Sequence, residues 1–220
     1  LDVVESLIGP EIYSNPVQHV RIKPPEKYLP KTKSGKAVLS ATQCHQDNGV
    51  VTREADDTNM LTVWFSLTDT PVEMGCLKVV PGSHQNGLLQ HCLDYVQGNG
   101  DVTGNGSRTI PEKLFAAEKT IPLPTKRSDL ICFHNKTVHG SLANVSEEVR
   151  WSFDLRYQPI GQPTGRPWFP GFVARSRANP ETELGDASRW RESWCEARAQ
   201  LSRGDNLSFN RWKQGDPRCA

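Results

Sequence analysis

Short runs in which apolar and polar residues alternate occupy most of the chain between residues 11 and 159. These runs predict β-strands over residues 17–22, 37–47, 60–67, 76–80, 130–134 and 149–157. Turn signals such as Pro81-Gly82-Ser83 separate the runs. Many short strands at close spacing are typical of a β-sandwich or a barrel, so we expect a mainly β fold.

Helical spacing of apolar residues occurs near both ends of the chain. The first stretch contains Val3, Val4, Leu7 and Ile8, and Gly9-Pro10 should end that helix. The second begins at an expected N-cap, Asp186, and has an apolar stripe of Trp190, Trp194, Ala197 and Leu201. We interpret this stripe as packing against the β core rather than as a functional surface.

Two of the predicted strands have one polar and one apolar face, because successive side chains of a strand point to opposite sides. The polar face of 149–157 consists of Arg150, Ser152, Asp154 and Arg156. In 60–67, Thr62, Trp64 and Ser66 share one face. The strand at 149–157 either lies at the surface with its polar face in water, or lines a cavity that holds an anionic ligand. In 60–67, an indole between two hydroxyl residues suits either a wall that contacts a flat or partly polar ligand or ordinary packing. The alternation by itself fits both arrangements.

The composition is that of one globular domain, because 220 residues with 36% hydrophobic content suffice for a sizeable core. A net charge of +1 gives no electrostatic reason to expect nucleic acid or an anionic membrane as a partner. No apolar run approaches the roughly 18 residues that a membrane span requires. Since the sequence begins at Leu1 rather than methionine, we expect that an N-terminal portion is missing from it.

The six cysteines are scattered, and no two of them form a CxxC pair. They are Cys44, Cys76, Cys92, Cys132, Cys195 and Cys219. This distribution argues against a zinc site, and a disulfide framework is not expected in a chain of this size. We therefore predict buried free thiols and a cytoplasmic location.

The stretch CHQDNGVV, residues 44–51, places an imidazole and a carboxylate two positions apart. In a strand, His45 and Asp47 would point the same way and share a metal ion. A third ligand must come from elsewhere, and His134 and His139, on either side of a turn, are the candidates. Two histidines and one carboxylate on a β scaffold form the facial triad of non-haem Fe(II) oxygenases.

Several motifs, in this order along the chain, resemble the phytanoyl-CoA dioxygenase family of Fe(II)/2-oxoglutarate-dependent enzymes. They are HQD at 45–47, VWFSLTD at 63–69, GCLKVVPGSH at 75–84, VHGS at 138–141 and then Arg150, eleven residues after His139. The resemblance covers about residues 1–157, and 161–177 is similar to a C-terminal extension found in a bacterial or fungal subgroup.

The resemblance implies a double-stranded β-helix (jelly-roll) core with flanking α-helices. It also implies that His45, Asp47 and His139 bind Fe(II), since the Ser and Arg spacing favours His139 over His134. Arg150 matches the arginine that holds the distal carboxylate of 2-oxoglutarate, Ser141 matches an assisting hydroxyl, and Trp64 matches a tryptophan beside this cosubstrate. His84, in PGSH, is left out as part of a turn.

We therefore expect a single oxygenase domain over 1–220, with a core at about 11–160 and a C-terminal extension at 161–220 whose helix packs on that core. Its reaction would use O2 and hydroxylate a small organic molecule, with release of succinate and CO2. The alternatives are a cupin-like metal enzyme that does not use 2-oxoglutarate, such as an isomerase, and a non-catalytic binder of a small ligand. The segments 48–59, 88–120 and 163–172 should shape the substrate pocket, but they reveal neither the substrate nor the oligomeric state.

Overall fold

The computed structural model describes residues 1–31, 41–93, 108–204, 210–213 and 215–219. Within these ranges most regular structure is β, as the alternation predicted. The larger sheet contains β1 (Glu11–Ser14), β2 (His19–Lys23), β4 (Leu61–Ser66), β9 (Leu130–His134), β11 (Arg150–Pro159) and β12 (Phe172–Ser176). The smaller sheet contains β3 (Thr42–His45), β5 (Leu77–Val79), β8 (Ile121–Leu123) and β10 (His139–Ser141). A separate pair is formed by β6 (Cys92–Leu93) and β7 (Arg108–Thr109).

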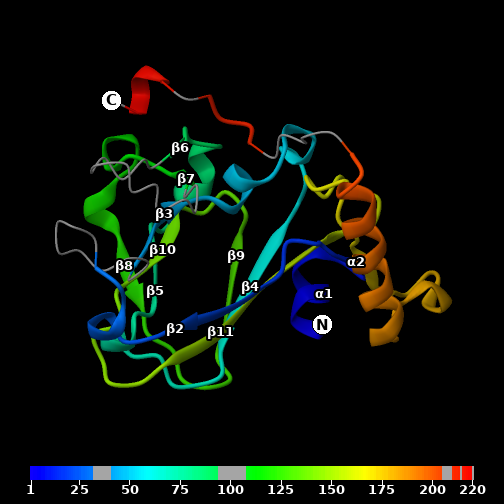
Figure 1. Ribbon diagram of the computed structural model, residues 1–220, viewed down its shortest axis with the longest axis horizontal. Helices are drawn as coiled ribbons and strands as arrows, with labels where there is room; N and C mark the ends of the chain where they lie inside the picture. Colours follow the sequence, from blue (N-terminus) through cyan, green and yellow to red (C-terminus); the bar gives the residue numbers. More distant parts are fainter. Residues whose placement is uncertain (32–40, 94–107, 205–209, 214, 220) are drawn as a thin grey trace.

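Strand β11 is the centre of the larger sheet, whose order is β12-β1-β11-β4-β9. Figure 1 labels β4, β9 and β11 of this sheet. One edge of β11 pairs with two strands, β1 along residues 157–159 and β2 along residues 150–154. Its other edge pairs antiparallel with β4. The smaller sheet has the order β3-β10-β5-β8. Side chains from both sheets line one inner cavity, so the two sheets face each other.

The inward face of the larger sheet is polar, which decides between the two arrangements that the sequence allowed. Arg150, Ser152 and Arg156 are almost fully buried, whereas Trp151 is 42% exposed. Strand β2 has the same inverted pattern, because Val20 and Ile22 are more than half exposed while Lys23 is buried. These strands therefore direct charged side chains into the space between the sheets.

Apolar packing lies instead on the outer faces of the two sheets. One cluster, formed by Val4, Ile12, Leu61 and Val63, packs the N-terminal helix α1 (Asp2–Ile8) against the larger sheet. A second cluster, formed by Cys44, Val80, Ile110 and Val138, covers the smaller sheet. Burial of such side chains contributes about 1.5–3 kcal/mol each, which stabilises the two sheets around their polar interior.

The C-terminal helix α2 (Ala187–Leu201) begins at the predicted cap, where the amide of Ser188 donates to the Asp186 carboxylate over 2.8 Å. Its Trp190 ring lies 4.7 Å from that of Phe172, the first residue of β12. Strand β12 pairs with β1. The larger sheet thus includes a strand beyond residue 160, inside the stretch that we expected to be an extension. None of the helices in the described ranges has the length and apolar character needed to cross a membrane.

Candidate metal centre and adjoining cavities

Three possible metal ligands meet at one end of the smaller sheet. His45 is the last residue of β3, and Asp47 begins the 3-10 turn η2 (Asp47–Val50), so the strand ends earlier than predicted. Gln46 between them keeps extended backbone angles (φ −114°, ψ 139°), which directs both side chains to one side. His139 begins β10 and is paired in register with His45. The two imidazole rings are 4.3 Å apart between centroids.

The backbone selects the tautomer of both histidines. Nδ1 of His45 lies 2.9 Å from the carbonyl oxygen of Gln43, and Nδ1 of His139 lies 2.9 Å from that of Thr137. Because a carbonyl oxygen only accepts, each Nδ1 carries the proton and donates it. Burial, followed by the neighbouring His139, lowers the pKa of His45 to about 3. His45 is therefore neutral near pH 7, and its Nε2 lone pair is available to a metal.

The Asp47 carboxylate is fully buried and completes this cluster. Its Oδ1 lies 3.9 Å from Nε2 of His45 and 3.9 Å from Nε2 of His139. Arg156 donates to Oδ1, and the hydroxyl of Thr62 donates to Oδ2. Burial by itself raises the pKa of Asp47, but the charge of Arg156, and next that of His139, lower it to about 2. The carboxylate therefore stays ionised.

This donor set fits one divalent metal ion. The ligand atoms of His45, Asp47 and His139 all lie within 4.8 Å of one another. Imidazole and carboxylate ligands bind such ions at about 2.0–2.2 Å, so only small side-chain movements would bring all three donors onto one ion. Two imidazoles and one carboxylate, with further coordination positions free, are the set used by non-haem Fe(II). His134 lies outside this group and accepts a hydrogen bond from the Lys136 amide over 3.1 Å.

Residues from distant segments hold the turn that carries Asp47. The backbone amide of Gln46 donates to Nε2 of His91 over 2.9 Å, and the His91 ring stacks on Trp212 with centroids 5.0 Å apart. Trp212 in turn donates from its indole nitrogen to the carbonyl of Gly49 over 2.6 Å. A side chain at Gly49 would overlap the His91 ring. The position of Asp47 thus depends on the C-terminal segment.

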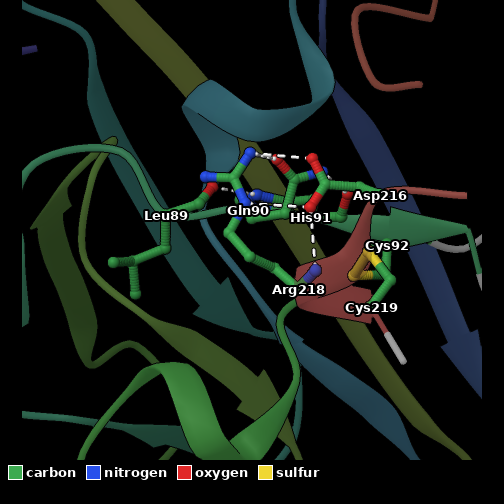
Figure 2. Close-up of a disulfide and its surroundings, with 7 residues drawn as sticks. All are labelled: Leu89, Gln90, His91, Cys92, Asp216, Arg218 and Cys219. Atoms are coloured by element: carbon green, nitrogen blue, oxygen red, sulfur yellow. Dashed lines mark hydrogen bonds and ion pairs between the residues drawn. A yellow bond between two sulfur atoms is a disulfide. The ribbon is translucent and has the colours of Figure 1, made fainter. Parts of the chain in front are cut away.

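A disulfide between Cys92 and Cys219 joins that segment to the strand after His91 (Figure 2). Beside it, Arg218 donates to the side-chain oxygen of Gln90 over 2.7 Å. The prediction that all cysteines are free is therefore wrong for this pair. The sequence could not reveal the bond, because the two residues are 127 positions apart and pairing depends on their distance in space. Cys44, Cys76, Cys132 and Cys195 are free, and the first two are buried as expected.

The three residues assigned to the cosubstrate line a narrow cavity between the sheets, together with His45 and His139. Arg150 and Trp64 enter it from the larger sheet, and Ser141 enters it from the smaller one. The Arg150 guanidinium lies 5.5 Å from the centroid of the Trp64 ring and donates to the carbonyl of Gly75. Arg150 therefore faces His139 from the opposite sheet.

Lys23 is a second cation at this end of the cavity, and the sequence analysis did not identify it. It is 7% exposed and donates from Nζ to the Ser141 hydroxyl over 2.7 Å and to the Leu142 carbonyl over 2.6 Å. Burial, followed by the charge of Arg150, lowers the pKa of Lys23 to about 7. Burial and the charge of Arg21 lower the pKa of Arg150 to about 10. The alternation in β2, with Arg21 and Lys23 on one face, was the available signal.

A larger cavity of about 480 Å³ adjoins the metal cluster and opens beyond it. His45 and Asp47 line its inner part, and four arginines are distributed around it: Arg21, Arg108, Arg156 and Arg166. Phe169, which precedes β12, and Trp194 of α2 form an aromatic part of the wall. Trp194 thus lines this cavity as well as packing against the core, the role that we assigned to it from the sequence. Phe169 and Arg166 belong to the predicted pocket segment 163–172, whereas Arg108 belongs to 88–120, of which residues 94–107 lie outside the described residues.

One family model covers all the sequence motifs from HQD at 45–47 to Arg150. The family model named Phytanoyl-CoA dioxygenase (PhyH) matches residues 1–152. The phytanoyl-CoA dioxygenase of Arabidopsis thaliana is 29% identical over 111 residues, which cover 50% of this chain and 36% of that protein. The 1-deoxypentalenic acid 11-beta-hydroxylase of Streptomyces arenae is 29% identical over 150 residues, covering 64% of this chain and 51% of that protein. The matched stretches thus span only between about a third and a half of these relatives.

Solved structures share the fold. The non-heme monooxygenase ThoJ aligns with a TM-score of 0.60 at 19% identity, covering 90% of this chain and 70% of that chain. The epimerase SnoN, solved in complex with Fe3+, alpha ketoglutarate and nogalamycin RO, aligns with a TM-score of 0.50 at 26% identity, covering 74% and 57%. The expected mainly β, double-stranded β-helix fold with flanking α-helices is therefore confirmed.

Proposed function

Because the chain belongs to the phytanoyl-CoA dioxygenase (PhyH) family, we propose that it is an Fe(II)- and 2-oxoglutarate-dependent oxygenase that acts on a small organic molecule. One observation carries this proposal. The His45, Asp47 and His139 donors lie beside a buried guanidinium, that of Arg150, with which no carboxylate of the described residues forms an ion pair. A metal site and an anion site thus share one cavity.

His45, Asp47 and His139 would hold the iron. With O2 and 2-oxoglutarate, the bound iron would supply the oxidation of a substrate C–H bond, with release of succinate and CO2. The protein contributes the positions of the groups. The Gln43 and Thr137 carbonyls orient the two imidazoles, while Arg156 and Thr62 fix the carboxylate. Such contacts to ligating side chains typically change metal affinity by about 10–100-fold.

Arg150 would bind the distal carboxylate of 2-oxoglutarate, since a planar guanidinium suits bidentate binding of that group. Ser141 would donate its hydroxyl proton to the same carboxylate, because its oxygen already accepts from Lys23 and from the Thr42 amide. Trp64 would form the wall beside it. The inner cavity measures about 20 Å³, enough for about one water molecule. Cosubstrate binding must therefore move its lining side chains apart.

We propose hydroxylation as the outcome. The support is the presence of Asp47, whose anionic oxygen would take the coordination position that a halide needs, and the named hydroxylase among the relatives. The epimerase among the solved structures shows that this fold also hosts reactions other than hydroxylation. Product masses measured with 18O2 in a chloride-containing buffer test the proposal. A chlorinated product would refute it, and a product whose added oxygen follows the isotope would support it.

Replacement of His139 tests the metal site itself. His139→Ala should abolish Fe(II) binding, measured by anaerobic calorimetry, and with it the 2-oxoglutarate turnover. His134→Ala is the matched control, because that histidine lies outside the donor group. The ligand assignment is wrong if His134→Ala loses iron while His139→Ala retains it. If the protein binds metal but does not turn over 2-oxoglutarate, the result would instead support one of the two alternatives, a cupin-like isomerase or a small-ligand binder.

We also propose a cytoplasmic location, which now rests on four free cysteines rather than six. The Cys92–Cys219 bond argues in the other direction, because disulfides persist mainly in oxidising compartments. Alkylation of the protein in freshly lysed cells, followed by mass spectrometry, tests the location. Alkylated Cys92 and Cys219 would support a reducing compartment, and a protected pair would contradict it.

A further inference from the structure

The peptide that joins two of the proposed metal ligands is held by one short loop, residues 87–92. Gln46 lies between these ligands, and its side-chain amide donates to the Gly87 carbonyl over 2.8 Å and accepts from the Leu89 amide over 2.8 Å. Its backbone amide donates to Nε2 of His91 over 2.9 Å. Gln46 and His91 are fully buried. A movement of this loop would therefore change the position of one ligand relative to the other.

His91 is the residue of this loop that contacts the backbone between the ligands. Its Nδ1 lies 2.9 Å from the Leu89 carbonyl, which only accepts, so Nδ1 carries the proton and Nε2 is the acceptor for the Gln46 amide. Burial lowers the pKa of His91 to about 4, so the ring is neutral near pH 7. His91 thus supports the ligand peptide without belonging to the group of metal donors.

The C-terminal segment contacts both this loop and the turn that carries the carboxylate ligand. Trp212 stacks on His91 and donates to the Gly49 carbonyl, so one side chain bridges the loop and the turn. Arg211 forms an ion pair with Asp56 over 2.5 Å, just beyond the same turn. The C-terminal segment therefore fixes His91 against the metal-ligand turn.

The Cys92–Cys219 disulfide closes this arrangement (Figure 2). Cys92 directly follows His91, and Cys219 directly follows Arg218, whose guanidinium donates to Gln90 over 2.7 Å. Arg218 is exposed, and exposed polar contacts contribute little to stability. The covalent bond is therefore the strong restraint at this junction. When it is cut, local opening of the C-terminal segment becomes easier, and the aromatic stack opens with it.

We propose that Cys92 and Cys219 form a redox-responsive site that sets the affinity of the metal centre, with His91 as the positioning residue that transmits the effect. The disulfide form keeps the ligand peptide in place and binds the metal more tightly, whereas the dithiol form lets the peptide move. Contacts that support ligating side chains change metal affinity by about 10–100-fold, and we expect a difference of about tenfold. The inference rests on the metal site of the proposed function and not on its reaction.

The switch requires a dithiol reductant of the thioredoxin class. One of its thiolates attacks a sulfur of the protein pair and forms a mixed disulfide, and its second thiol then displaces the protein. The protein disulfide gains two electrons and two protons and becomes two thiols, while the reductant loses both and becomes a disulfide. Cys219 is half-buried and Cys92 is 9% exposed, so we expect the first attack at Cys219.

Calorimetric titration with Mn(II) tests the switch. This hard ion suits carboxylate ligands and binds thiols poorly, so the cysteines do not compete for it. The oxidised protein should bind it about tenfold more tightly than protein that was reduced with a phosphine and then freed of the reductant under nitrogen. The double variant Cys92→Ser/Cys219→Ser should match the reduced protein under both conditions. Cys195→Ser, at an exposed free cysteine, is the matched control and should keep the full difference.

Variants of His91 test how the effect reaches the metal. His91→Phe keeps a ring against Trp212 but removes the acceptor for the Gln46 amide, so it should bind Mn(II) about tenfold more weakly and respond no further to reduction. His91→Gln, whose amide oxygen accepts hydrogen bonds, should recover part of the affinity and of the redox response. If His91 only stabilised the fold, His91→Phe would unfold more easily and keep the affinity ratio between the two redox forms. That result would overturn the positioning role.

Linkage requires the reverse effect, because a metal that prefers the disulfide form must favour that form by the same factor. Saturating Mn(II) should therefore lower the reduction potential of the pair by about 30 mV if the preference is about tenfold. Equilibration in glutathione buffers, followed by alkylation and mass spectrometry, measures the potential. Equal Mn(II) affinities of the two redox forms, or an unchanged potential, would overturn the inference.

A separate result tests the metal site on which the inference rests. His139→Ala should abolish Mn(II) binding in both redox forms. If this variant retains binding, the metal-site assignment is wrong and the inference fails with it. If the variant loses binding while the unaltered protein binds equally in both forms, only the redox linkage is refuted. Circular dichroism at the titration temperature should show a folded reduced protein, and unfolding on reduction would overturn the role of His91 in the loss of metal.

Discussion

Arg150 and Arg156 lie near opposite ends of the inward face of β11, and they have opposite electrostatic surroundings. Arg156 pairs with Asp47 and lies 3.4 Å from Asp154. Burial opposes its charge, but Asp154 and Asp47 raise its pKa above the ordinary value. Arg150 hydrogen-bonds the Gly75 carbonyl and lies over Trp64, and its pKa is lowered to about 10, mainly by burial.

The difference favours a structural role for Arg156 and supports the ligand-binding role that we propose for Arg150. The charge of Arg156 is neutralised by the protein itself, so an incoming carboxylate gains little there and would compete with Asp47. No carboxylate within the described ranges forms an ion pair with Arg150, whose buried charge is close to a second cation, Lys23. A buried cation of this kind is stabilised by an anion, which a dicarboxylate cosubstrate would provide. Each prediction below tests one side of this comparison.

The largest effect is expected from Arg156→Gln, measured on metal-free protein by chemical denaturation. The variant leaves Asp47 buried without its ion-pair partner, and breaking a buried pair in this way costs about 3–5 kcal/mol. The free energy of unfolding should fall by that amount. The double variant Arg156→Gln/Asp47→Asn should be less destabilised than the sum of the single variants, because it removes both charges. Strictly additive losses would show that the pair is not coupled.

Much of this arrangement could be read from the alternation in the sequence, but not its direction. The pattern correctly grouped Arg150, Ser152, Asp154 and Arg156 on one face of a strand. An alternating strand looks the same whether its polar face points inward or outward, so only the packing of both sheets decided it. For the same reason Lys23 was missed, although His19, Arg21 and Lys23 alternate in β2 just as clearly.

The candidate site was predictable where its residues are close in sequence or follow a family motif. HQD placed His45 and Asp47 together, while the partner of Asp47, Arg156, comes from a strand 109 positions away. The supports of the Asp47 turn, His91 and Trp212, have no sequence signal that links them to it. Contacts of this kind arise from the folded arrangement of segments and are not encoded in a local pattern.

The second prediction concerns the Cys92–Cys219 disulfide, which holds the C-terminal segment that supports the Asp47 turn. Cys219→Ser should lower the free energy of unfolding by about 2–4 kcal/mol, because the bond restricts the unfolded chain across a long loop. Reduction of the unaltered protein should have the same effect in thermal or chemical denaturation. Cys195→Ser is the control, since that cysteine is free and exposed, and it should change little. Equal stability of the oxidised and reduced protein would contradict a disulfide that holds this end.

The third prediction concerns the Arg150 end. Arg150→Gln should raise the dissociation constant for 2-oxoglutarate more than about tenfold, since loss of one partner of a charge pair in a partly buried site costs roughly 2–5 kcal/mol. Without cosubstrate, the same variant should not lose stability as Arg156→Gln does, because it removes a desolvated charge. Calorimetry and denaturation give the two values, and Arg127→Gln, at an exposed arginine, is the control. If the affinity for 2-oxoglutarate did not change, Arg150 would not be the residue that binds the cosubstrate.

The smallest effect is a pH dependence that comes from Lys23. Its pKa in the folded protein is about 7, below the ordinary 10.5. Between these values the unfolded chain binds a proton at this residue that the folded protein does not bind. The unfolded state therefore binds more protons, and the stability of the folded state rises with pH through this window. The slope from one such group is at most about 1.4 kcal/mol per pH unit.

Lys23→Met removes this group, so the difference in free energy of unfolding between the unaltered protein and the variant should change with pH. Denaturation curves between about pH 7 and pH 9 should show the unaltered protein gaining stability relative to Lys23→Met as the pH rises. Saturating 2-oxoglutarate should reduce this slope, because a bound dianion favours the protonated lysine beside Arg150. Parallel curves for the two proteins without cosubstrate would mean that Lys23 is charged at neutral pH, and the Arg150 end would then carry two full cations.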